Sequence, residues 1–273
     1  MFEYIRKDMR QVEGWLSRCD AEMFATLLSC QTINNFSGAV AEIGVHHGKS
    51  FILMARGNQS QAAYAIDIFE QQHLNIDGSG RGDKSEFLAN LQNHKVCAEA
   101  VVIDERLSSE VMPEDILSTV GRTRFFHVDG GHHINAVLHD LKLAEAVVRD
   151  EGIIVVDDAF RSEWPEVSMG LFAHLTDCDD FVLFAVGFNK AYLCRRAYAD
   201  LYQSALIQNE FISMYFSKVC ETSVGTILVY QRYPLPEWSV KTKLFDYIKM
   251  NYPEVAHFIH KNILGRNRNV YDA

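Results

Sequence analysis

Apolar residues recur along the chain in two patterns, one typical of helices and one typical of strands. In the first 36 residues they fall three or four positions apart, with charged residues between them, which predicts helices. After residue 38, short continuous apolar runs alternate with helical patterns. These runs cover residues 39–45, 62–69, 98–103, 124–129 and 152–157. Because strands that are apolar on both faces belong in a parallel sheet covered by helices, the alternation predicts a doubly wound α/β fold.

The pattern changes after residue 158. Two apolar runs, 181–186 and 191–194, flank a turn at residues 187–190, which predicts an antiparallel hairpin. With the five runs before it, this hairpin gives a Rossmann-like sheet of seven strands.

The rest of the chain predicts helical additions around this sheet. A helix is expected over residues 197–218, a strand over 226–230, a break at the prolines of 234–236, and a further helix over 241–263. We therefore expect an N-terminal helical cap, an α/β core and a mostly helical C-terminal extension that contacts substrate or a second copy in a homodimer. The cap covers residues 1–36, the core covers residues 37–196 and the extension covers residues 197–273.

Composition narrows the class of protein. Hydrophobic residues make up 48% of the chain and charged residues 23%, which excludes wholesale disorder. The net charge of −10 argues against nucleic acid, whose phosphates need a basic surface. The six cysteines show no Cys-x-x-Cys pair, so neither a disulfide framework nor a thiolate zinc site is expected, and a reducing cytoplasm fits best. The first residues are charged and the longest apolar run, 181–188, is short, so no membrane segment is expected.

A glycine-containing loop follows the first predicted strand. Glu42, Gly44 and Gly48 form an E-x-G-x-x-x-G element, in which the glycines allow a sharp turn and let a ligand approach the backbone. Asp67 ends the second strand, where a carboxylate can accept both hydroxyls of a ribose. Together these residues predict a nucleotide-type cofactor site. The other glycine-rich stretch, residues 78–83, is interpreted as a mobile surface loop.

Acidic residues follow the fourth and fifth strands. Because the carboxyl ends of parallel strands meet at one edge, Asp129, Asp157 and Asp158 are expected to converge there. Mg²⁺ would compensate three such carboxylates, because it prefers oxygen ligands. In the alternative, Asp158 binds the metal and Asp157 is a capping residue. His132 could take a proton from a substrate hydroxyl, with the adjacent His133 and the pair His46 and His47 as alternatives.

The string V-D-G-G-H-H-x-x-x-V-x-x-D-L, followed by G-I-I-V-V-D-D, resembles the metal-dependent class I S-adenosylmethionine-dependent O-methyltransferases. It is most similar to the branch that methylates macrolide sugars, whose relatives include cephalosporin hydroxylase-like proteins. The resemblance covers about residues 39–196. It implies Asp129, Asp157 and Asp158 as magnesium ligands, with Asp129 and His132 as catalytic residues. It also implies an S-adenosylmethionine site of Glu42, Gly44, Gly48, Ser50 and Asp67.

Three functions remain open on the sequence. The first is methyl transfer to a hydroxyl of a small molecule, such as a sugar of a natural product or glycan. The second is a non-heme iron hydroxylase, in which Asp129 and His132 join His127 or His133 as metal ligands. The third is a protein that binds S-adenosylmethionine without turnover. The usual Gly-x-Ser is missing after the third strand, so the adenine contacts are not predicted.

Overall fold

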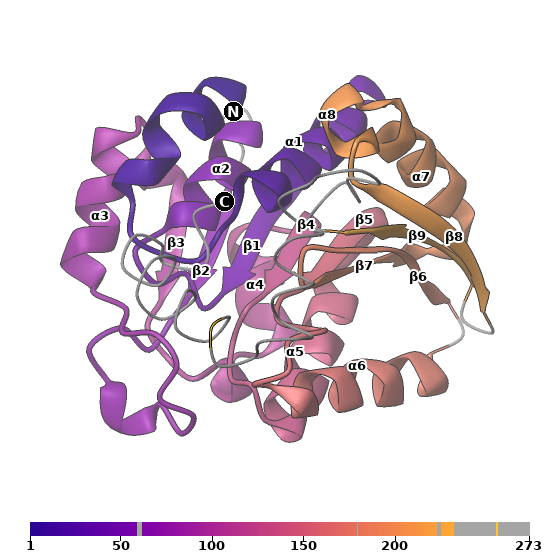
Figure 1. Cartoon of the computed structure of the whole chain (residues 1–273). Helices are drawn as coiled ribbons and strands as arrows, with labels where there is room; N and C mark the ends of the chain where they lie inside the picture. The colour runs from indigo at the N-terminus through magenta and orange to yellow at the C-terminus, as the bar shows by residue number, and fades with distance from the viewer. Residues whose placement is uncertain (59–61, 179, 223–224, 232–254, 256–273) are drawn as a thin grey trace.

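The computed structural model (Figure 1) describes residues 1–58, 62–178, 180–222 and 225–231, together with Val255. One nine-stranded sheet forms its centre, in the order β3-β2-β1-β4-β5-β7-β6-β9-β8. The strands are β1 Ala39–Ile43, β2 Ala63–Ile66, β3 Val101–Asp104, β4 Thr123–Val128, β5 Val148–Val156, β6 Phe181–Gly187, β7 Lys190–Arg195, β8 Phe216–Thr222 and β9 Gly225–Tyr230.

Strands β1 to β5 are parallel, as their continuous apolar runs predict. The strands β1, β2 and β4 are buried along their whole length. The predicted hairpin is confirmed, since β7 runs antiparallel to both β5 and β6. The carboxyl ends of β1, β2, β4 and β5 therefore meet at one edge of the sheet, where ligands of open α/β folds bind.

Helices cover both faces of the sheet (Figure 1). One apolar core joins α1, α2, α3 and α7 to one face, and a second core joins α4, α5 and α6 to the other. The helices are α1 Arg18–Ile33, α2 Lys49–Gly57, α3 Lys84–Asn93, α4 Pro113–Thr119, α5 Ile134–Val147, α6 Pro165–Asp177, α7 Ala199–Gln208 and α8 Glu210–Ser213. Short 3₁₀ segments are Met9–Gln11, Gln72–Leu74, Ala98–Ala100, Ser108–Glu110 and Arg196–Tyr198, and Tyr4–Asp8 is a π-helical turn.

The N-terminal helix packs directly on the sheet. Ser17 begins α1 with a capping box, in which its side chain accepts from the Asp20 amide while Asp20 accepts from the Ser17 amide. Further along the helix, the ring of Phe24 contacts Phe125 and His127 on β4. The helix is buried on most sides, which explains why its apolar residues do not form one narrow stripe.

The chain beyond residue 208 differs from the prediction. The expected helix over 197–218 ends at Gln208, because Asn209 caps the short α8 with its side chain. Residues 216–222 form β8 instead, which pairs with β9 and extends the sheet from the expected seven strands to nine. The extension is therefore not mostly helical in its described part, and the helix expected over 241–263 lies outside the described residues. No helix in the described ranges has the length and apolarity needed to cross a membrane.

Candidate functional site

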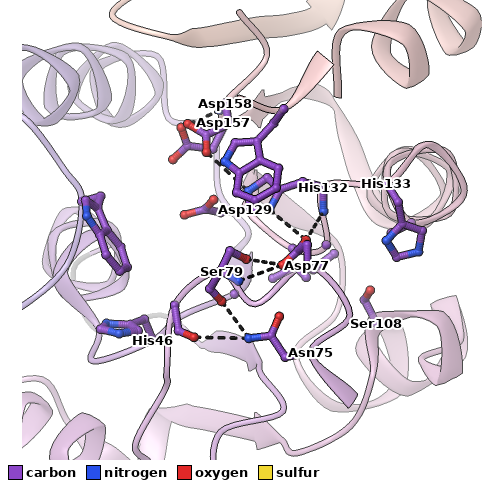
Figure 2. Close-up of a pocket in the computed structure, with 18 of the residues that line it drawn as sticks. His46, Asn75, Asp77, Ser79, Ser108, Asp129, His132, His133, Asp157 and Asp158 are labelled. Carbon is purple, nitrogen blue, oxygen red and sulfur yellow. Dashed lines mark hydrogen bonds and ion pairs between the residues drawn. The ribbon is translucent and has the colours of Figure 1, made fainter. Parts of the chain in front are cut away.

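A cavity of about 900 Å³ opens at the carboxyl edge of the sheet. Its lining includes six of the residues predicted from the sequence, namely Gly44, Asp67, Asp129, His132, Asp157 and Asp158. Glu42, Gly48 and Ser50 do not line it. Figure 2 shows Asp129, Asp157 and Asp158 gathered at one side of the cavity, with His132 and Asp77 beside them.

Gly44 allows β1 and β4 to approach each other at the cavity floor. Its φ is +81°, and a Cβ atom there would lie 1.8 Å from the carbonyl oxygen of Asp129. The Asp129 amide donates to the carbonyl of Ile43 at 3.0 Å, so the two chains stay paired beyond the end of the strands. The glycine is therefore required by the close approach of the neighbouring chain.

Asp67 is held by the backbone around it. One carboxylate oxygen accepts from the amide of His46 at 2.7 Å, and the other accepts from the amide of Phe69 at 2.6 Å. Burial raises the pKa of Asp67 above its usual value, although these two amides act in the opposite direction. Each oxygen keeps a second lone pair, so the carboxylate can still accept hydroxyl groups.

A row of buried polar side chains crosses four neighbouring strands beneath the cavity. Glu42 on β1 accepts from Ser50 at 2.5 Å and contacts Nδ1 of His127 on β4 at 2.6 Å. Nε2 of His127 lies 3.4 Å from Asp157 Oδ2, and that same oxygen pairs with the ammonium of Lys190 on β7. We call Glu42, His127, Asp157 and Lys190 the polar row.

The charges in this region compensate one another unevenly. Burial opposes ionisation of His127, but hydrogen bonds to Asp157 and Glu42 prevail and raise its pKa to about 10. Burial would raise the pKa of Asp157, but the Lys190 ammonium and His127 hold it below its usual range. Burial and the charge of Asp157 raise the pKa of Asp129 well above its usual range. The negative charge of Asp129 is thus less well compensated by nearby positive charge than that of Asp157.

His132 is clamped in place on three sides. Its Nδ1 lies 2.9 Å from Asp77 Oδ2, which also accepts its backbone amide at 2.7 Å, and its Nε2 lies 3.3 Å from Asp158 Oδ2. The indole of Trp164 stacks on the imidazole at 4.4 Å between centroids. Burial would lower the pKa of His132, but the two carboxylates raise it to about 10.

Asp158, the third aspartate of the predicted metal set, is bound by other side chains. Its φ is +52°, and its carboxylate contacts Asn189, Arg161 and His132. The metal-sized cluster found among the described site residues consists of His127, Asp129 and Asp157, whose ligand atoms lie within 4.8 Å of one another. Asp129 and Asp157 thus lie within this distance of each other, and Asp158 lies at the same side of the cavity outside the cluster.

Comparison with known proteins finds a family that resembles the part of the chain that holds the site. Residues 41–159, which hold every predicted site residue, match the family model of a methyltransferase domain. This part of the chain is therefore similar in sequence to a methyltransferase domain. This finding confirms the resemblance to the class I methyltransferases that the sequence motifs indicate. A search of curated proteins finds no match.

Two solved structures share the fold of the methyltransferase domain and its surroundings. The O-methyltransferase NovP is 17% identical, with a TM-score of 0.54, and the match covers 65% of this chain and 80% of NovP. CalS11, described as a TDP-rhamnose 3′-O-methyltransferase of calicheamicin biosynthesis, is 14% identical, with a TM-score of 0.51. That match covers 72% of this chain and 87% of CalS11. At these identities the likeness shows a common fold.

Several residues of the methyltransferase site were not predicted from the sequence. Asp77 immediately precedes the glycine-rich stretch 78–83. This part of the chain lies over the cavity, because Asp77 binds His132 and Asn75 donates to the carbonyl of Ser79 at 2.8 Å (Figure 2). Lys190 is the first residue of β7, at a position that the sequence predicts as part of a turn, and it lies outside residues 41–159. A lysine in a turn is normally a solvated residue, so only its 2% exposure reveals its role.

Proposed function

We propose that this protein is an S-adenosylmethionine-dependent O-methyltransferase that methylates a hydroxyl group of a small molecule. The observation that carries the proposal is one continuous cavity, with Asp67 at the cofactor side and Asp129, His132, Asp157 and Asp158 at the other. Its volume of about 900 Å³ is near the upper end of the range for small-molecule sites, which suits a cofactor and an acceptor bound together. The methyltransferase family match and the O-methyltransferase fold relatives support it.

The cofactor is assigned to the loop that follows β1 and to the end of β2. Gly44 leaves the backbone open to a ligand, and the carboxylate of Asp67 has free lone pairs for the ribose hydroxyls. Glu42, Gly48 and Ser50 act behind this surface. Glu42 and Ser50 bind each other, while a Cβ atom at Gly48 would lie 2.8 Å from the ring of Phe87. These three residues shape the cofactor loop from within the protein.

A divalent cation such as Mg²⁺ fits the acidic side of the cavity. The fit rests on the donor set, because Asp129 and Asp157 offer carboxylate oxygens that lie within 4.8 Å of each other, and Mg²⁺ prefers oxygen ligands. Asp129 and Asp157 would hold the ion, and Asp158 would join them by leaving its present partners. When bound, the ion would supply positive charge that lowers the pKa of the acceptor hydroxyl and offsets the carboxylates around His132.

His132 is the proposed base in this arrangement. Asp77 fixes its Nδ1 side and Trp164 fixes the plane of the ring, which leaves Nε2 directed to the side of Asp158. An acceptor hydroxyl that replaces Asp158 as the partner of Nε2 can transfer its proton to that nitrogen. The oxygen then attacks the methyl group, and the proton remains on His132 until product leaves.

A sugar hydroxyl is the acceptor that we favour. The cavity wall combines the aromatic side chains of Trp15, Trp164 and Phe160 with polar groups such as Ser108 and Asn189. Aromatic faces and hydrogen-bonding groups in one wall suit a sugar ring, which has apolar faces and hydroxyl edges. CalS11, a fold relative, is described as acting on a TDP-linked rhamnose.

The experiment measures cofactor binding and methyl transfer separately. Calorimetry with S-adenosylhomocysteine should give saturable binding to the full chain, weakened in Asp67→Ala by about 1.5–3 kcal/mol, the worth of hydrogen bonds to a charged group. The control is Asp83→Asn, because Asp83 caps α3 and does not line the cavity. Transfer of labelled methyl from S-adenosylmethionine is then assayed against nucleotide-linked sugars. Absence of binding, or equal binding in both variants, would overturn the cofactor assignment.

The hydroxylase alternative gains no support from the geometry. A site of two histidines and one carboxylate would need His132 beside Asp129 together with His127 or His133. Among the described residues, His127 is the histidine that joins Asp129 in a metal-sized cluster, and His132 is held by Asp77 and Asp158.

A further inference from the structure

A second cluster of metal-ligating side chains lies between α5 and α6. Oε2 of Glu145 on α5 is 3.4 Å from Nε2 of His174 on α6, and Oε1 of Glu145 is 3.2 Å from Sγ of Cys178, the residue after α6. The ligand atoms of all three residues lie within 4.8 Å of one another. None of them lines the cavity. The cluster is thus separate from the methyltransferase site.

The donor types and their spacing match a zinc ion. One sulfur, one imidazole nitrogen and one carboxylate suit Zn²⁺, whereas Mg²⁺ prefers oxygen donors alone. Zinc bonds of about 2.0–2.3 Å at tetrahedral angles place neighbouring ligand atoms about 3.3–3.8 Å apart. The two separations from Glu145 are close to that range. His174 and Cys178 are four residues apart at the end of α6, so one helical turn brings both to the same side.

The surroundings favour a cation at this position. The amide of Ile134 at the start of α5 donates to Glu166 at the start of α6, so the two helices run in the same direction and their carboxyl ends meet near the cluster. Those ends carry partial negative charge. The side chain of His174 is 5% exposed, so an ion bound to it would lie largely out of contact with bulk water.

The charged neighbours of the cluster nearly balance. Lys142 and Arg195 add positive charge and Asp177 adds negative charge. Arg195 is itself paired with Asp150 and Asp180, which reduces its effect. Burial raises the pKa of the Cys178 thiol, but the backbone amide of Phe181 donates to its sulfur and would stabilise a thiolate.

We propose that Glu145, His174 and Cys178 bind one Zn²⁺ ion, which ties the carboxyl ends of α5 and α6 together. Binding releases the thiol proton of Cys178 to solvent, forms the zinc–sulfur bond and leaves a fourth position for water. Both helices begin next to the loops that carry the candidate catalytic residues, α5 after His133 and α6 after Trp164. The ion would therefore fix the far ends of the elements that support the active site.

Cobalt provides the test, because a Co²⁺–thiolate bond gives a charge-transfer absorption that oxygen and nitrogen ligands do not give. The full chain, freed of metal by chelation, is titrated with Co²⁺ and then with Zn²⁺. The absorption should appear at one equivalent and be removed by zinc. Ions bound by Asp129 and Asp157 would give no such band, since the cluster at that site contains no cysteine.

The variants locate the site. Cys178→Ser should abolish the band and weaken zinc binding by at least about tenfold in competition with a coloured chelator, and Glu145→Gln should weaken zinc binding while keeping the thiol. Cys97→Ser is the matched control, because Cys97 is exposed and its thiol donates a hydrogen bond to nearby Glu99. Circular dichroism checks that each variant is folded. Absence of the band in the parent protein, or its persistence in Cys178→Ser, overturns the proposal.

Discussion

Asp77 offers the sharpest test of how the site orients its base. In Asp77→Asn, the side chain keeps its size but loses the charge that contacts Nδ1 of His132 at 2.9 Å and its amide at 2.7 Å. A hydrogen bond to a charged group is worth about 1.5–3 kcal/mol. If that energy holds the imidazole in its reactive orientation, kcat should fall about 10- to 150-fold, since each 1.36 kcal/mol is tenfold.

The pH dependence of kcat distinguishes a specific effect on His132 from a general loss of structure. Asp77 helps to raise the pKa of His132 to about 10, so removal of its charge must lower that pKa. A base must be unprotonated to act, so activity rises as pH passes the pKa of the base. The acid limb of the kcat profile should therefore move to lower pH in Asp77→Asn, while the plateau falls.

The assay is methyl transfer at saturating cofactor across a pH series, with calorimetry to check that S-adenosylhomocysteine still binds. Asp83→Asn is the matched control, because it removes the same charge from the same loop between β2 and α3, and its side chain caps α3 by accepting from the Glu86 amide. An unchanged plateau and an unmoved acid limb in Asp77→Asn would refute the assignment of His132 as a base oriented by Asp77.

Three further outcomes are expected. Gly44→Ala should fail to fold, or should have a melting temperature far below that of the parent protein, because its Cβ would overlap the carbonyl of Asp129. An unchanged melting temperature would show that the two chains can move apart at this position. Chelation of divalent metals should abolish turnover, while calorimetry still detects cofactor binding. Asp129→Asn should have the same effect as the chelator. Full activity in the presence of chelator would show that the reaction needs no divalent cation. Lys190→Met should lower the free energy of unfolding by about 3–5 kcal/mol in urea titrations, because it removes the ammonium that pairs with buried Asp157. A loss below about 1 kcal/mol would mean that His127 or water compensates that carboxylate.

The sequence predicts the sheet well because each buried parallel strand is a continuous apolar run. The same logic brings Asp129 and Asp157 to one edge, as the structure shows. The nine-stranded extent of the sheet was not predictable, because β8 alternates poorly and is mostly exposed, so its pattern differs little from that of a surface helix.

The interior of the site was harder to predict than its edge. Asp77 meets His132 across 55 residues of chain, and nothing near either residue in the sequence signals that contact. Lys190 reaches Asp157 only because β7 pairs with β5 in a particular register. Glu42 was expected at the cofactor, but its position within the strand directs it to His127 and Ser50 instead. Local patterns determine strands, whereas these contacts depend on how strands and loops are placed in three dimensions.

The polar row has a consequence for how the sheet assembles. Glu42 and His127 are direct partners in the β1–β4 pairing, and β5 and β7 pair up to Val156 and Ala191, the residues next to Asp157 and Lys190. Most other buried side chains of these strands are apolar, and apolar contacts depend less on an exact alignment than paired charges do. A slip of one residue on β4 would turn the imidazole of His127 to the opposite face and leave carboxylates buried alone, at a cost of several kcal/mol. The four charged residues thus favour one register for the pairing of the four strands. Once the polar row has formed, the pairings shifted by one residue are excluded.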